Sequence, residues 1–159
     1  MVYDNARGEI VLFGSTRPAP ELSDTWVFRT GPGPQANLRV TALKAPSAVA
    51  IGATFTIRHT TRNDGPGTAG PSRTALWLST DRRLGGDTLL VTRAVPTLAA
   101  GTVSGGSISV PLPALDPGTY YLLAQADADS EVLETSETDN LRVRAITVSS
   151  GLTADPGLR

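Results

Sequence analysis

The stretch 116-DPGTYYLLAQAD-127 carries the strongest indication of the fold. Residues 119–126 form a nearly continuous apolar run of strand length, which is typical of a central strand of a sheet. The Asp-x-Gly-x-Tyr pattern before it marks a turn, and in Greek-key sandwiches a tyrosine at such a corner donates its hydroxyl to nearby backbone. Asp116, Gly118 and Tyr120 are therefore predicted structural residues of a tyrosine corner. An ordinary turn followed by a core tyrosine is the alternative.

Six further runs on either side of this stretch have the length and patterning of β-strands, and turn residues such as 63-NDGPG-67 separate them. The last run changes parity after Ala145, and a β-bulge near Arg144 would reconcile its halves. The pattern predicts an all-β, seven-stranded, immunoglobulin-like Greek-key β-sandwich over residues 37–148. The predicted strands are residues 38–43, 54–62, 73–79, 88–95, 107–112, 119–126 and 141–148.

The 159-residue chain is expected to hold this one domain with appendages. Residues 30–36 are Gly/Pro-rich and are predicted to be a linker, and residues 149–159 a flexible tail. No apolar run approaches the roughly 20 residues of a membrane span, and the N-terminus lacks a secretion signal. The net charge of −1 offers no field that would recruit nucleic acid. The absence of cysteine excludes disulfides and thiolate zinc sites.

The acidic run 127-DADSEVLETSETDN-140 holds six of the fifteen acidic residues, and no Lys or Arg interrupts it. Ca²⁺ takes 6–8 oxygen ligands, and the polar loop 80-TDRRLGGD-87 could add carboxylates to the run. The alternative is a solvated turn whose side chains cap backbone amides, and the spacing departs from that of an EF-hand loop. The candidate calcium ligands are Asp81, Asp87, Asp127, Asp129, Glu134, Glu137, Asp139 and Asn140.

Trp77 is the candidate ligand platform. If Leu76 and Leu78 point inward, strand alternation turns Trp77 outward, where an indole could stack on a sugar or anchor an interface. Packing in the core or at an edge is the alternative. His59 is the only histidine, its position in the alternation is inward, and no nucleophile motif accompanies it, so we expect a structural histidine that is hydrogen-bonded or partly buried. We identify no catalytic residue and predict that the chain is not an enzyme.

Six segments, taken in order, resemble the bacterial cell-adhesion-related module CARDB. The resemblance covers residues 37–148 and implies an immunoglobulin-like sandwich that is repeated or appended in large exported proteins, with a role in adhesion and no reaction. It implies an extracellular or cell-surface location and a protein or glycan partner on a surface. The segments are 63-NDGPGTAGPS-72, 76-LWLSTD-81, 87-DTLL-90, 98-LAAG-101, 118-GTYYLLAQAD-127 and 134-ETSETDN-140.

The first 28 residues resemble part of a kelch repeat, through 1-MVYDNARGEIVLFGS-15 and 24-DTWVF-28. Ser15 stands where the repeat has the second glycine of a pair. A kelch repeat is one blade of a propeller, and a single blade cannot bury both faces without its neighbours. We therefore expect residues 1–29 to be a propeller remnant that forms a β-hairpin of low stability. Its apolar residues could pack against the sandwich, pair with the exposed edge of another copy of the chain, or stay disordered.

Three functions follow from these patterns. The leading hypothesis is a non-catalytic extracellular adhesion or spacer module of a larger bacterial surface or secreted protein. One alternative is a carbohydrate- or calcium-dependent ligand-binding module that uses Trp77 or the acidic run. Another is an accessory domain of an exported enzyme whose catalytic region lies outside this chain. Ca²⁺ is the one candidate cofactor.

Overall fold

The computed structural model describes residues 2–4, 9–12, 26–29 and 33–150, in two units, Met1–Pro34 and Gln35–Arg159. The first unit has three antiparallel strands in the order β1-β2-β3: β1 (Val2–Asp4), β2 (Glu9–Leu12) and β3 (Trp26–Arg29). The predicted hairpin therefore gains a strand, because β3 pairs with the edge of β2 that β1 leaves free. The rest of the predicted remnant, residues 30–32 of the linker and residues 151–159 of the tail lie outside the described residues.

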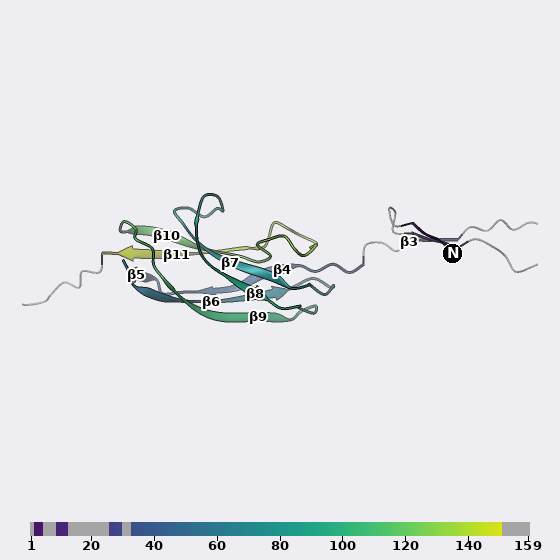
Figure 1. Ribbon diagram of the computed structural model, residues 1–159, viewed down its shortest axis with the longest axis horizontal. Coiled ribbons are helices and arrows are strands. Elements are labelled where there is room, and N and C mark those ends of the chain that lie inside the picture. The colour runs from purple at the N-terminus through teal and green to yellow at the C-terminus, as the bar shows by residue number, and fades with distance from the viewer. Residues whose placement is uncertain (1, 5–8, 13–25, 30–32, 151–159) are drawn as a thin grey trace, which may run out of the picture. The chain divides into compact units, whose positions relative to one another are not determined.

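The second unit is a sandwich of two sheets (Figure 1), one in the order β5-β11-β10-β7-β8 and the other β4-β6-β9. No helix occurs in the described part of the chain. The predicted all-β class is confirmed, and the sequence missed one of the eight strands. The strands are β4 (Leu38–Lys44), β5 (Ala48–Ala50), β6 (Thr54–Asn63), β7 (Ser72–Ser79), β8 (Thr88–Val95), β9 (Val103–Pro111), β10 (Gly118–Gln125) and β11 (Leu141–Ser149).

The missed strand, β5, is three residues long and pairs in parallel with the end of β11. A segment this short carries no readable alternation, so only its partner reveals it. The predicted bulge near Arg144 is wrong, because β10 and β11 pair in unbroken register from Gly118 opposite Val148 to Gln125 opposite Leu141. Arg144 itself lies on the inward side of β11 and donates to the carbonyl of Ala45 at 2.7 Å. The apparent change of parity arises because the first five residues of β11 are partly or fully exposed, so their burial does not alternate clearly.

The hydrophobic core lies between the two sheets. Each of five strands contributes a fully buried aliphatic side chain, and burying such a side chain stabilises the fold by roughly 1.5–3 kcal/mol. The five side chains are Leu38, Ile57, Leu76, Leu122 and Ile146.

At the start of β10, Tyr120 donates its hydroxyl to the carbonyl of Asp116 at 3.1 Å, which is the backbone contact of a tyrosine corner.

His59 lies inside the sandwich on β6, with 2% of its surface exposed. Its inward position is as predicted, but neither ring nitrogen has a hydrogen-bond partner among the described residues, so the expected hydrogen bond is not seen. Burial lowers the pKa of the imidazole below its usual value, and the positive charge of Arg93 lowers it further. The neutral form is therefore favoured inside the core.

Candidate functional site

The acidic run forms the loop between β10 and β11. Directly after β10, Asp127 has a left-handed backbone with φ of 44°, and Ser130 has φ of 52°. Aspartate tolerates this conformation better than most residues do. The amide of Ala128 donates to the carbonyl of Arg73 at 2.9 Å, which ties the start of the loop to β7.

Asp127 holds the first turn of this loop from the inside. Its Oδ1 accepts the amide of Glu131 at 3.1 Å and its Oδ2 accepts the amide of Val132 at 2.9 Å. Only 2% of the residue is exposed. The alternative expected from the sequence, in which acidic side chains cap backbone amides, therefore describes part of what Asp127 does.

Glu134 joins the loop to the start of β4. Its Oε2 accepts the amide of Leu38, the first residue of that strand, and its Oε1 accepts Nδ2 of Asn140 at 3.2 Å. The neighbouring amide of Thr135 donates to the carbonyl of Ala36 at 2.9 Å. Glu134 is 6% exposed. The middle of the loop thus lies against the edge of the other sheet.

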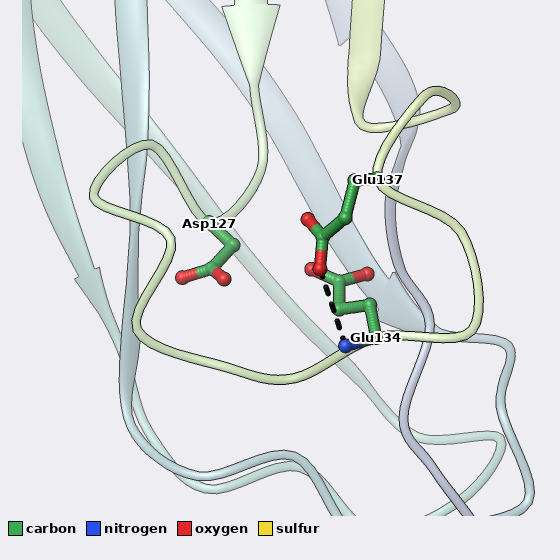
Figure 2. Close-up of side chains that lie close together, drawn as sticks. All are labelled: Asp127, Glu134 and Glu137. Atoms are coloured by element: carbon green, nitrogen blue, oxygen red, sulfur yellow. Dashed lines mark hydrogen bonds between the residues drawn. The ribbon is translucent and has the colours of Figure 1, made fainter.

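Three carboxylates converge at this point: those of Asp127, Glu134 and Glu137 lie within 4.8 Å of one another (Figure 2). Glu137 is exposed and accepts the amide of Glu134 at 3.3 Å. Burial raises the pKa of Glu134 to about 7, and the charges of Glu137 and Asp127 add to the rise, while the hydrogen bonds from Leu38 and Asn140 oppose it. Near neutral pH the cluster therefore has either a shared proton or an unbalanced negative charge.

A hard divalent cation fits this set of donors. All three side chains offer carboxylate oxygens, and Oδ1 of Asn140, whose amide nitrogen binds Glu134, is buried without a partner among the described residues. Oxygen ligands of this kind suit Ca²⁺ and Mg²⁺ rather than the softer metals that prefer nitrogen and sulfur. The charge of a bound cation would offset the negative charges of Glu137 and Asp127, which add to the effect of burial on the pKa of Glu134.

The other predicted ligands have different partners. Asp129 pairs with Arg73 at 3.7 Å on the surface. Asp139 pairs with Arg39 at 3.1 Å and accepts Nδ2 of Asn37 at 3.2 Å. These two carboxylates lie in the same loop as the cluster, but the convergent group does not include them.

Asp81 and Asp87 belong to the loop at the far end of the strands. Because β7 and β10 are antiparallel, residues 80–87 follow the end of β7 where β10 begins, and residues 126–140 follow the end of β10 where β7 begins. Asp81 accepts the amide of Arg83 at 2.7 Å, and Asp87 accepts the amide of Gly85 at 2.9 Å. Both carboxylates thus shape their own loop.

Trp77 lies on the outer face of the five-stranded sheet, because its neighbours Leu76 and Leu78 are buried in the core. It lines a pocket with residues 84–87 and Gln125. Sequence reasoning identified Trp77 but missed Gln125, which reads as one more residue of an apolar strand. Only the pairing of β7 with β10 brings it beside the indole.

Residues 35–144 match the CARDB family, and the chain belongs to it. A crystal structure of a CARDB domain from Pyrococcus furiosus in complex with di-metal ions is similar, with a TM-score of 0.58 at 17% identity, covering 72% of this chain and 90% of that chain. The solution NMR structure of a CARDB domain from the same organism gives 0.56 at 16% identity, covering 74% and 96%. The immunoglobulin-like sandwich is thereby shown. CARDB domains are small, non-catalytic β-sandwich modules.

The same fold forms a small part of much longer chains. A β-glucosidase from Thermotoga neapolitana in complex with α-D-glucose matches with a TM-score of 0.51 at 13% identity, covering 70% of this chain but 16% of the enzyme. No curated protein matches the chain. The family match begins at residue 35, so the kelch-like character of residues 1–28 stays a prediction. Within the described ranges, no helix has the length and apolarity that crossing a bilayer requires.

Proposed function

We propose that this CARDB domain is an extracellular spacer or adhesion module of a larger protein, and that a divalent cation, Ca²⁺, holds its 126–140 loop in place. The observation that carries the proposal is the convergence of three carboxylates, two of them buried, within 4.8 Å. Charges of one sign at this distance repel strongly where little water screens them. A bound cation converts that repulsion into a link between the loop and β4.

The link would stiffen the module along its length. Glu134 already connects the loop to the first residue of β4, and β4 follows directly on the segment that enters the domain. A spacer carries load from one terminus to the other, so fastening a long loop to the entering strand resists local opening there. The expected partner is a protein or glycan on a surface. Residues 1–29 could add self-association through a strand edge.

An accessory role beside an enzyme is the second candidate. The glucosidase match supports it only as an example of this fold within a longer chain, because the likeness covers 16% of that chain and shows the fold alone. In such a parent, the chemistry would lie outside the residues described above, and the cation would have the same structural role.

Thermal unfolding in EDTA, Ca²⁺ and Mg²⁺ tests the cation. Ca²⁺ at 100 times its dissociation constant should stabilise the domain by about 2.7 kcal/mol. Glu137→Gln should abolish this gain with little effect on folding in EDTA, because Glu137 is exposed. Glu131→Gln removes the same charge from an exposed position of the loop outside the cluster, and it should keep the gain.

Two results would contradict the cation. The first is a melting temperature of the wild type that is the same in EDTA and in millimolar Ca²⁺. The second is an equal gain in the wild type and in Glu137→Gln, which would place the ion elsewhere on the molecule. A larger gain with Mg²⁺ than with Ca²⁺ would replace calcium with magnesium.

A further inference from the structure

The outer face of the five-stranded sheet carries an apolar row that crosses four strands. Trp77 on β7 is paired with Leu89 on β8 and with Leu123 on β10, and Leu123 is paired in turn with Val143 on β11. Leu123 is fully buried although it lies outside the core between the sheets. Other groups on this outer face therefore cover Leu123, and Trp77 is its direct neighbour.

The 80–87 loop folds back over this face. The guanidinium of Arg82 lies 5.3 Å from the ring centre of Tyr121, which occupies the outer face two residues before Leu123. Farther along the loop, Gly85 and Gly86 have φ of 153° and 78°, conformations that side chains rarely adopt. Glycine adopts these conformations without strain, and a pocket remains between the loop and the strands.

This pocket has a volume of about 370 Å³, within the roughly 300–1,000 Å³ typical of small-molecule sites. One wall is the indole of Trp77, with Leu84 beside it. The indole Nε1 is buried, so a ligand would contact the carbon atoms of the ring. Buried Leu123 lies opposite Trp77 on the neighbouring strand β10.

The pocket has two polar side chains, those of Gln125 and Asp87, and each can hydrogen-bond to a ligand. Gln125 lies on the outer face beside Trp77, and its side-chain amide has no partner among the described residues, so it offers a donor and an acceptor. Asp87 uses Oδ2 to accept the amide of Gly85 at 2.9 Å, while its Oδ1 has no partner within the described ranges. Among the described residues, no cationic side chain lines the pocket.

We propose that this pocket binds one ring of a neutral carbohydrate, stacked on Trp77 and hydrogen-bonded through its hydroxyls to Gln125 and Asp87. A pyranose has an apolar face that suits an indole and adjacent hydroxyls that both donate and accept hydrogen bonds. The carboxylate of Asp87 disfavours anionic sugars, because no cation in the pocket offsets it. Among the described residues, the pocket and the carboxylate cluster share no member, although Gln125 lies two residues before Asp127.

Heteronuclear NMR of the ¹⁵N-labelled full chain tests the site. The chain holds two tryptophans, so Trp77→Phe assigns the Trp77 indole signal. Neutral oligosaccharides of glucose, galactose, mannose and xylose are titrated to about 10 mM, which detects dissociation constants near 1 mM. We expect at least one to shift the Trp77 indole and the Gln125 amide, equally in EDTA and in Ca²⁺.

Variants locate the binding. Trp77→Ala should weaken it at least tenfold, and Gln125→Ala and Asp87→Ala by several-fold, close to the effect of one lost hydrogen bond. Gln125 and Asp87 are partly exposed, so these two variants keep the test valid even if Trp77→Ala fails to fold. Leu133→Ala, at a side chain 75% exposed on the other loop, is the control and should bind as the wild type does.

Two outcomes overturn the assignment. One is the absence of any shift at Trp77 with every oligosaccharide, and the other is binding that survives in both Trp77→Ala and Gln125→Ala. A lysine-rich peptide that shifts Trp77 where neutral sugars do not would also remove it, since an indole beside a carboxylate can accept a cation instead. Loss of Ca²⁺ binding would leave this result unchanged, so the two proposals fail separately.

Discussion

Both polar loops of the sandwich, residues 80–87 and 126–140, contain acidic residues, but the 80–87 loop has two Asp and two Arg, whereas the 126–140 loop has six acidic residues and no basic one. In the 126–140 loop the carboxylates of Asp127 and Glu134 turn inward, are buried and accept backbone amides from the loop and from β4. In the 80–87 loop, Asp81 and Asp87 accept amides of their own loop at its surface. Carboxylates in a polar loop therefore do not make a cation site unless they are buried and converge on one point.

The largest expected difference between the loops is in stability. In EDTA, Asp127→Ala should lower the free energy of unfolding by about 3 kcal/mol, because two amides lose a charged acceptor and alanine is strained at φ of 44°. Asp81→Ala removes an acceptor from an exposed turn and should cost less than about 1 kcal/mol. Urea unfolding measures both. Equal losses of unfolding free energy in the two variants would show that Asp127 stabilises the protein no more than Asp81 does.

The next expected effect is a pH dependence of stability that arises from Glu134 in the 126–140 loop. The pKa of Glu134 rises from 4.5 to about 7 on folding, so the folded protein binds the extra proton in this interval. Without a divalent cation, the free energy of unfolding should therefore fall as pH rises from 4.5 to 7, by up to about 3 kcal/mol. Glu134→Gln should remove this fall.

Urea unfolding of both proteins at pH 4.5, 5.5, 7 and 8 in EDTA measures this difference. His59 contributes a slope of opposite sign, because its pKa is lowered on folding and its contribution is lost as pH falls through 6.5. That slope is common to both proteins, so the difference between them reports Glu134. Curves that run parallel over the whole range would show that Glu134 is ionised normally.

A smaller effect than at Glu134 is expected from Tyr120, at the end of the sandwich that carries the 80–87 loop. Tyr120 lines a small pocket there with Ser79, Thr80 and Asp87, and its hydroxyl donates to the carbonyl of Asp116. Tyr120→Phe should lower the free energy of unfolding by about 1 kcal/mol, since the carbonyl loses its donor. Differential scanning calorimetry detects a change of this size. An unchanged melting temperature would mean that the corner contributes nothing to holding this end.

Much of the fold was readable before the structure. Clear alternation and turn residues located seven of the eight sandwich strands, with the residues of β8 predicted without error. The extra strand, β5, and the first four residues of β9 were missed, since 103-VSGG-106 has glycines where a strand usually has side chains. A Cβ on Gly106 would lie 2.8 Å from Nε of Arg93, and a Cβ on Gly105 would lie 3.3 Å from Oγ1 of Thr60, so each glycine leaves room for a neighbouring side chain.

The candidate sites were readable only in part. The acidic run pointed to Asp127, Glu134 and Glu137, but it carried no sign of which carboxylates would be buried. The sequence also suggested that the two polar loops could share a cation. The antiparallel pairing of β7 and β10 sets them at opposite ends of those strands. The sequence left open whether Trp77 lies on the outer face or packs in the core, and its pocket depends on the backbone path of residues 84–87.

The sequence by itself determined the class of fold and the supply of chemically useful side chains, because alternation, turn residues and the tyrosine corner are local properties of the chain. The tertiary structure alone decided which of those side chains meet. Strand order placed Glu134 on the start of β4 and Gln125 beside Trp77, and burial raised the pKa of Glu134. Such effects depend on distance and solvent access between residues far apart in the chain, which no local pattern encodes.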